Sequence, residues 1–242
     1  MYAIETNALV KRYKNLTAVD GLDLQVRQGE IFSLLGVNGA GKTTTIKMLS
    51  CLSAPTAGNA LVGGHSIATQ SAAIKQLIAV APQQTAVAPN LTAKENLQLI
   101  CGIHGFSKEK TARKIQSLSQ MFDLEGVLSR KAGKLSDGWQ RRISLAMALI
   151  SDPKILFLDE PTLGLDVMAR HALWDIIGSL RGTVTIILTT HYMEEAQALS
   201  DRIGIMKNGK LIAVGTAQEL KNKAGTDDFE QAFVTIVKED AV

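Results

Sequence analysis

Short apolar runs alternate with longer stretches of helical periodicity along much of the chain. The apolar run at residues 30–35 precedes a helical pattern at 42–52, and the run at 155–158 precedes another at 169–180. Runs of this length are typical of strands buried on both faces, and helices that connect such strands produce a parallel sheet. The pattern therefore predicts an α/β fold with a largely parallel core sheet.

A different pattern occurs near the N-terminus. Residues 22–27 alternate between apolar and polar side chains, and the Gln-Gly-Glu sequence at 28–30 that follows is typical of a turn. Alternation with a period of two indicates a strand with one face in solvent, as antiparallel sheets often have. We therefore expect a half-exposed antiparallel strand here.

The middle of the chain has a helical character. Residues 94–103, 108–122 and 138–150 have helical patterns, separated by glycines and by a Ser-Asp-Gly sequence. We interpret residues 84–152, approximately, as a helical insertion rather than as a separate domain.

The last residues, 221–242, are more polar than the body of the chain, and only 228–237 has a clear apolar periodicity. We therefore expect one domain over residues 1–220, followed by a short C-terminal tail at 221–242.

Composition narrows the class of protein. A chain of 242 residues with 46% hydrophobic residues is expected to form one globular domain with a sizeable core. Its 26 basic and 23 acidic residues nearly balance and form no long run of one sign, so we expect no nucleic-acid partner. The apolar runs are far shorter than the roughly 20 residues that span a bilayer, so a membrane role would require another polypeptide.

A glycine-rich segment at residues 36–43, Gly-Val-Asn-Gly-Ala-Gly-Lys-Thr, matches the pattern GxxxxGK[ST] between a strand and a helix. Its glycines allow backbone N–H groups to point at phosphate oxygens, and the following helix adds the positive end of its dipole. We expect Lys42 to reach the β- and γ-phosphates and Thr43 to bind Mg²⁺. The predicted nucleotide-binding residues here are Gly36, Val37, Asn38, Gly39, Ala40, Gly41, Lys42, Thr43 and Thr44.

Two apolar runs are followed by side chains that can bind a metal ion or take part in catalysis. The run at 155–158 ends in Asp159 and Glu160, at the strand edge where α/β sheets bind nucleotides. Asp159 would hold Mg²⁺, and Glu160 would polarise the attacking water; a surface turn with two acids is the alternative. The run at 184–188 ends before His191, which could contact the γ-phosphate, although a lone His in this position is more often structural.

Six motifs in chain order resemble the nucleotide-binding domain of ATP-binding cassette (ABC) transporters, over roughly residues 1–220. They are the loop at 36–43, Ala-Pro-Gln at 81–83, Leu-Ser-Asp-Gly-Trp-Gln-Arg-Arg at 135–142, Asp-Glu at 159–160, Leu-Gly-Leu-Asp at 163–166 and Thr-His at 190–191. The Leu-Ser-x-Gly sequence is the most specific, since other P-loop ATPases and kinases lack it. The resemblance implies a P-loop NTPase core, an N-terminal antiparallel β subdomain and a helical insertion.

The resemblance also implies an ATPase with ATP and Mg²⁺ as cofactors. It assigns catalytic roles to Gln83, Glu160 and His191, and metal contacts to Thr43, Gln83 and Asp159. Tyr13 would stack on adenine, as an aromatic face can. Considered alone, Tyr13 would more often be a packing residue and Gln83 a polar loop residue.

A second subunit is implied as well. The signature residues Ser136, Asp137, Gly138, Trp139 and Gln140 would contact the ATP held by that subunit, and Asp166 would line the contact between the two domains. The second cassette would be identical or a close paralogue, and integral membrane permease subunits would bind the pair at the cytoplasmic face of the inner (plasma) membrane. Asp137 stands where glycine is usual and Trp139 where glutamine is usual; we expect the Asp137 side chain to point outward.

The tail sequence at 228–233, Asp-Phe-Glu-Gln-Ala-Phe, resembles the ends of ATPase subunits of the ABC-2 type, which implies export. One alternative is an ABC ATPase that is not coupled to transport, which the chain length and the even charge disfavour. Another is a P-loop kinase or a module that binds nucleotide without hydrolysis. The Leu-Ser-x-Gly sequence opposes the kinase, and Glu160 opposes a site without hydrolysis.

Overall fold

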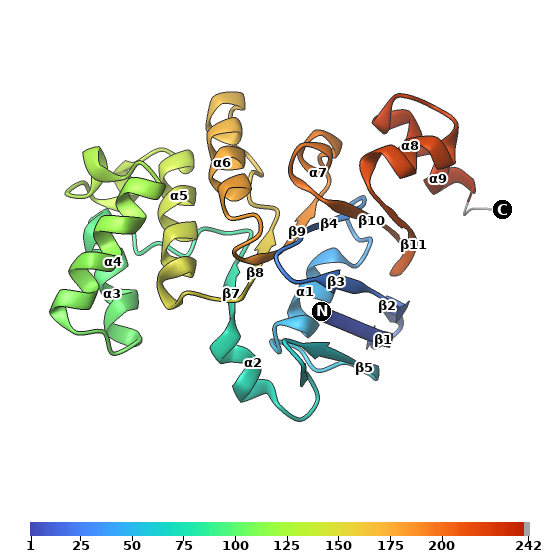
Figure 1. The fold of residues 1–242 in the computed structure, drawn as a ribbon, viewed down its shortest axis with the longest axis horizontal. Coiled ribbons are helices and arrows are strands. Elements are labelled where there is room, and N and C mark those ends of the chain that lie inside the picture. Colours follow the sequence, from blue (N-terminus) through green and yellow to red (C-terminus); the bar gives the residue numbers. More distant parts are fainter. Residues whose placement is uncertain (240–242) are drawn as a thin grey trace.

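The computed structural model describes residues 1–239 and contains two β-sheets flanked by helices (Figure 1). The first sheet is antiparallel throughout, with the strand order β2-β1-β5-β6 and with β3 also paired to β1. Its strands are β1 (Tyr2–Tyr13), β2 (Leu16–Leu22), β3 (Gln25–Arg27), β5 (Ala57–Val62) and β6 (His65–Ser66). An antiparallel N-terminal sheet was predicted and is confirmed.

The alternating segment at 22–27 was expected to form one strand. It is divided between two strands, so this prediction is wrong. Burial alternates as predicted, but Leu22 ends β2 and β3 begins only at Gln25. The Thr6 hydroxyl of β1 accepts a hydrogen bond from the Leu24 N–H (2.8 Å) and donates one to the Leu22 carbonyl (2.7 Å). A side chain therefore takes the place of a backbone partner at the break.

The second sheet has six strands in the order β11-β10-β4-β9-β8-β7. All neighbouring strands are parallel except the β10–β11 hairpin, which confirms the largely parallel core sheet. The strands are β4 (Ile31–Leu35), β7 (Ile78–Ala81), β8 (Ile155–Asp159), β9 (Thr185–Thr190), β10 (Arg202–Lys207) and β11 (Lys210–Gly215). Every residue of β4, β8 and β9 is buried, as their largely apolar sequences predict.

Successive side chains of the central strands contribute to opposite cores. Ile155 and Phe157 of β8 join the core shared with the antiparallel sheet, whereas Leu156 and Leu158 join the core shared with the helical insertion. The helices beside the sheet are α1 (Lys42–Leu49), α2 (Ser71–Leu77), α6 (Val167–Ser179) and α7 (Met193–Leu199). The sheet is thus held between two layers, and its C-terminal edge carries the loops described below.

The chain leaves the sheet after β7 and returns at β8, and the helices between them form one end of the molecule (Figure 1). They are α3 (Ala93–Ile103), α4 (Lys108–Met121) and α5 (Asp137–Ala148), with short 3-10 turns at Glu125–Val127, Ala132–Lys134 and Leu149–Ser151. Thr92 and Glu95 form a capping box at α3, and the Ser107 hydroxyl caps α4. The three predicted helices are confirmed to within about two residues at their ends.

Two helices, α8 (Ala217–Ala224) and α9 (Phe229–Glu239), end the described chain. Phe229, Ala232 and Ile236 are buried on one face of α9, so the periodicity at 228–237 is confirmed as an amphipathic helix. Residues 240–242 of the predicted tail lie outside the described residues. Within residues 1–239, no helix is both long and apolar enough to cross a bilayer.

Candidate functional site

The glycine-rich segment forms the loop between β4, in the middle of the parallel sheet, and α1. Gly39 and Gly41 have φ values of 83° and 107°, in the region that favours glycine. A Cβ on Gly36 would lie 2.5 Å from the Met206 carbonyl oxygen, and one on Gly41 would lie 2.5 Å from the Ala18 carbonyl oxygen. The glycines are therefore required both by conformation and by close contact with β10 and β2.

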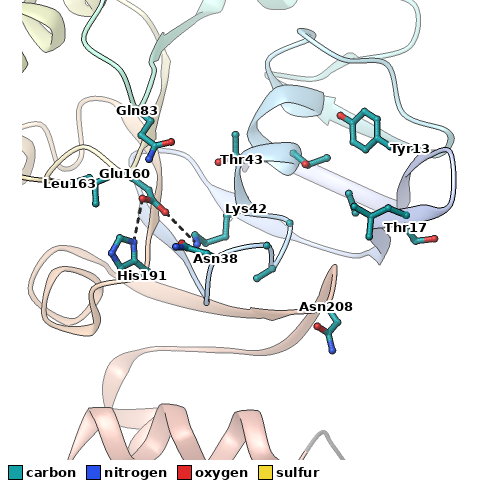
Figure 2. Close-up of a pocket in the computed structure, with 16 residues that line it drawn as sticks. Tyr13, Thr17, Asn38, Lys42, Thr43, Gln83, Glu160, Leu163, His191 and Asn208 are labelled. Carbon is teal, nitrogen blue, oxygen red and sulfur yellow. Dashed lines mark ion pairs between the residues drawn. The ribbon is translucent and has the colours of Figure 1, made fainter.

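Lys42 begins α1 and is 5% exposed. Its Nζ donates to the carbonyl oxygens of Gly36 (2.8 Å) and Val37 (3.2 Å), and it lies 3.5 Å from Glu160 Oε1 (Figure 2). Burial lowers the pKa of Lys42, and the nearby Glu160 carboxylate opposes this effect. The ammonium is thus held on the loop beside the cavity by carbonyl oxygens that a stronger anionic ligand can replace.

Asp159 and Thr43 are in direct contact where β8 and α1 meet. The Thr43 hydroxyl donates to Asp159 Oδ1 (2.9 Å), and the Thr189 hydroxyl of β9 donates to the same oxygen (2.5 Å). A carboxylate and a hydroxyl are the hard oxygen ligands that Mg²⁺ prefers. Among residues 1–239 there is no cluster of three or more acidic, His or Cys side chains suited to a metal, so Mg²⁺ here would need phosphate oxygens and water to complete its coordination.

Glu160 follows β8 with a φ of 48°, a strained value for a residue with a side chain. Its N–H donates to the Thr189 carbonyl oxygen (3.0 Å) and hydroxyl (3.1 Å). Its carboxylate lies between Lys42 and His191, with Oε2 at 3.3 Å from His191 Nδ1 (Figure 2). The backbone conformation thus places the carboxylate in the cavity, between two groups that can carry positive charge.

Of these groups, Lys42, Thr43, Glu160 and His191 line one cavity of about 640 Å³, whereas Asp159 does not line it and contacts Thr43 instead. Figure 2 shows Gln83, Glu160 and His191 on one side and Tyr13 on the other, with Thr43 between them. The predicted residues that line it are Tyr13, Asn38, Gly39, Ala40, Gly41, Lys42, Thr43, Thr44, Gln83, Glu160 and His191. Gly36 and Val37 do not line it, and instead their carbonyl groups hold Lys42.

Five lining residues were not predicted, namely Leu16, Thr17, Ala18, Leu163 and Asn208. Asn208 belongs to the turn between β10 and β11, where the Asn-Gly pair at 208–209 is a sequence signal for a hairpin. The Gly209 N–H donates to the Ala40 carbonyl oxygen (3.0 Å), which fixes this turn against the loop. The signal indicates the turn, but its position beside the loop depends on the tertiary structure.

The signature residues lie outside this cavity, at the N-terminus of α5. Ser136 is the exposed N-cap residue, and within the described structure its hydroxyl does not cap the helix. The next residue, Asp137, is also exposed, in line with the expected outward orientation, whereas Trp139 is half-buried. The Gln140 side chain donates to the Leu135 carbonyl oxygen (2.9 Å). Ser136 thus leaves a hydroxyl free beside a helix N-terminus, where an anion is favoured.

Asp166 is the N-cap of α6 and also lies outside the cavity. Its Oδ1 accepts a hydrogen bond from the Ala169 N–H (2.9 Å). The following Val167 and Met168 are 59% and 78% exposed. The short segment after Glu160 therefore leads from the cavity to an exposed, partly apolar surface.

Glu195 of α7 is a buried carboxyl group that is hydrogen-bonded to Thr162, in the segment that follows Glu160. Its Oε1 accepts hydrogen bonds from the Thr162 hydroxyl (2.7 Å) and from the Trp174 indole N–H (3.1 Å). Burial raises the pKa of Glu195, and hydrogen bonds with Thr190, Thr162 and Trp174, together with Arg170, only partly offset this effect. The carboxyl group therefore keeps its proton to a higher pH in the folded state than in the unfolded state.

This burial predicts that Glu195→Gln stabilises the protein at neutral pH. The stability contributed by Glu195 is fully present below its ordinary pKa of 4.5 and decreases as pH rises through the higher pKa of the folded state. Glutamine stays neutral, so the difference in Tm between the variant and the wild type should grow as pH rises above 4.5. In a chain of this size, each kcal/mol of difference in the free energy of unfolding raises the Tm by about 2–4 °C.

Calorimetry between pH 4.5 and 8 measures this difference. Glu194→Gln is the matched control, because Glu194 is exposed and its pair with Arg170 at 3.7 Å contributes little. If Glu195→Gln is less stable than the wild type at pH 8, then Glu195 of the wild type is a charged carboxylate that its partners stabilise, and the prediction is wrong.

Comparison with known proteins gives a consistent result. Residues 19–163 match the family model described as "ABC transporter". Among the curated relatives, the chain is 41% identical over 226 residues to the doxorubicin resistance ATP-binding protein DrrA of Mycobacterium tuberculosis, covering 92% of this chain and 68% of that protein.

Solved structures are similar over nearly the whole chain. The ATP-binding subunit of an ABC transporter superposes with a TM-score of 0.85 at 28% identity, covering 97% of this chain and 99% of that one. An ATP-binding cassette solved as a dimer in a post-hydrolysis state with ADP and phosphate has a TM-score of 0.79 at 26% identity, over 88% of this chain and 98% of that one.

Proposed function

Because the chain belongs to the ABC transporter family, we propose that it is the ATP-hydrolysing subunit of an exporter and drives a separate membrane permease. The observation that carries the proposal is the cavity of about 640 Å³ in which the phosphate loop, Gln83, Glu160 and His191 meet. The family is that of ATP-binding cassettes, and one similar cassette was solved with ADP and phosphate, the products of ATP hydrolysis.

The loop and α1 bind the triphosphate. Residues 38–41 of the loop and the N-terminus of α1 line the cavity, and no acidic residue lies in the first turn of the helix. The Lys42 ammonium exchanges the carbonyl groups of Gly36 and Val37 for phosphate oxygens. Tyr13, which is 43% exposed at the far end of the cavity, offers its ring to the adenine base.

Thr43 and Asp159 are suited to hold Mg²⁺, and Gln83 faces the same part of the cavity. Charge neutralisation of the phosphate oxygens is the chemistry that Mg²⁺ supplies when bound. Asp159 is held by Thr189 as well as by Thr43, so its carboxylate is already fixed in place.

Glu160 acts on the attacking water. Its carboxylate accepts the proton as the water oxygen bonds to the γ-phosphorus, while the bond from that phosphorus to the β,γ-bridging oxygen breaks, giving ADP and phosphate. His191, 3.3 Å from Glu160, keeps the carboxylate oriented and lies where it can contact the γ-phosphate.

A second cassette completes each site. Ser136 and Gly138 lie outside the cavity of their own chain, yet they present a free hydroxyl and a helix N-terminus. In a head-to-tail pair these groups bind the γ-phosphate held by the partner, which is either a second copy or a close paralogue. Asp166 and the exposed Val167 and Met168 supply the surface where the two cassettes meet.

The pairing predicts a small effect for Asp137→Gly. The Asp137 side chain is exposed, so its charge is screened by water and its removal should change ATP turnover only a few-fold. Steady-state ATPase assays at low and moderate salt measure this. A gain above about a hundredfold would mean that the carboxylate points at the partner's phosphates and costs several kcal/mol there.

The membrane partner is tested by affinity capture. We propose a location at the cytoplasmic face of the inner (plasma) membrane, with the chain attached through its permease. The tagged chain is captured from detergent-solubilised membranes, and proteins recovered in stoichiometric amounts are identified by mass spectrometry. A polytopic membrane protein is the expected result, and ribosomal or DNA-bound partners would show an ABC ATPase that is not coupled to transport.

A further inference from the structure

Two neighbouring arginines of α5 have opposite surroundings. Arg141 is 3% exposed and points into the protein. Arg142 points away, lies 3.5 Å from Asp123 and stacks its guanidinium over the Trp139 ring at 4.7 Å. Arg141 is therefore a buried arginine to which no role has yet been assigned, and Arg142 beside it can serve as the control in substitution experiments.

Arg141 binds three backbone carbonyl groups from two separate loops. Its Nη1 donates to the Pro82 oxygen (2.8 Å), and its Nη2 donates to the oxygens of Gln83 (2.7 Å) and Glu160 (3.1 Å). Charged donors form stronger hydrogen bonds than neutral ones, and the planar guanidinium fixes their directions. Pro82–Gln83 follows β7 and Glu160 follows β8, so Arg141 joins the ends of two adjacent parallel strands.

The contact with Glu160 matters because of that residue's strained backbone. A φ of 48° is strained for a residue with a side chain, and it persists only where the surrounding structure fixes the residue. The Glu160 N–H is fixed by Thr189, and its carbonyl oxygen accepts hydrogen bonds from Arg141 (3.1 Å) and from the Leu163 N–H (3.2 Å). Loss of the Arg141 contact leaves the carbonyl oxygen with the Leu163 contact alone, so the backbone that sets the direction of the carboxylate is held less firmly.

We propose that Arg141 is a positioning residue for ATP hydrolysis: it holds the backbones of Gln83 and Glu160 and ties both of them to α5. The inference rests on the proposed function. Among residues 1–239, Arg141 is not one of those that line the cavity, and its hydrogen bonds go to Pro82, Gln83 and Glu160 rather than to the loop at 36–43 or Lys42, so we expect its effect on turnover rather than on nucleotide binding.

Arg141→Lys tests the proposal, because lysine keeps the charge but lacks the planar fork that reaches three carbonyl groups. The expected result is a fall in kcat of at least about tenfold, since small displacements of catalytic groups are costly, with the Kd for ATP changed less than about threefold. Arg142→Lys, the matched control, should keep kcat within about twofold of the wild type. An Arg141→Lys protein with the turnover of the wild type would overturn the proposal.

A second variant separates positioning from folding. Arg141→Ala leaves a space that free guanidinium ions at low millimolar concentration can enter, and partial recovery of kcat is expected. A loss of turnover that guanidinium does not restore, together with a matching loss of ATP affinity or of Tm, would assign Arg141 to the stability of the fold.

Amide hydrogen exchange provides a readout that does not depend on hydrolysis. Faster exchange is expected at the amides of Gln83, Gln84, Glu160 and Thr162 in nucleotide-free Arg141→Lys, with no such change in Arg142→Lys. Unchanged exchange would overturn the inference. A wild-type chain that does not hydrolyse ATP, by itself or with its partners, would contradict the proposed function. The exchange experiment would still show whether Arg141 holds the two backbone segments, because it does not depend on hydrolysis.

Discussion

Replacing Glu160 with glutamine is expected to lower ATP turnover by about 10²–10⁴-fold, the range associated with loss of a general base. The amide keeps the shape of the side chain but cannot accept the proton of the attacking water. The Lys42 contact at 3.5 Å weakens, but the phosphate loop is untouched, so ATP affinity should change only a few-fold. Phosphate release in the steady state and ATP binding by calorimetry measure the two quantities.

Glu194→Gln is the matched control for this substitution. Glu194 is exposed on α7, close in sequence to His191, and its carboxylate does not line the cavity. Its replacement should leave turnover within about twofold of the wild type. A Glu160→Gln protein that retains a tenth or more of the turnover would mean that another group activates the water.

Lys42→Ala is expected to remove ATP binding at physiological concentration. Lys42 is buried, and loss of a buried charged contact costs about 2–5 kcal/mol, which corresponds to a Kd roughly 30- to 5,000-fold higher. Turnover should fall with binding, and ATP should no longer promote pairing of the cassettes. Titration with ATP by calorimetry gives the affinity.

Lys47→Ala provides the comparison for this effect, because Lys47 lies on the same helix and is exposed. Its Kd for ATP should stay within about twofold of the wild type. Equal affinities of the Lys42→Ala and wild-type proteins would show that the triphosphate does not bind at this loop.

Local sequence was sufficient to predict the glycine-rich loop at residues 36–43 and the strand and helix beside it. Its glycines, Lys42 and Thr43 lie in one continuous segment, and the flanking strand and helix are visible as apolar patterns. Asp159 and His191 could be placed at the same edge because Asp159 ends one buried parallel strand and His191 follows the next. Where the position of a side chain follows directly from strand order, the sequence pattern and the structure agree.

Features that depend on long-range contacts could not be predicted in this way. Arg141 and Arg142 are the same residue type in sequence, yet the Arg141 side chain is hydrogen-bonded to Pro82, Gln83 and Glu160, whereas the Arg142 side chain is partly buried and pairs with Asp123. The break at residues 23–24 depends on the Thr6 hydroxyl, which lies far along the chain. Neither feature has a periodic signal, because both depend on how distant segments pack.

The most direct test of the central claim is to count the nucleotide trapped by Glu160→Gln. The variant is captured from detergent-solubilised membranes with whatever partners it retains, equilibrated with Mg·ATP, freed of unbound nucleotide and examined for mass and ATP content. We expect an assembly with two cassettes, either two copies of this chain or this chain with a related subunit, that retains one ATP per intact site. A single cassette that carries the nucleotide alone, or an assembly that retains none, would contradict a site shared between two subunits.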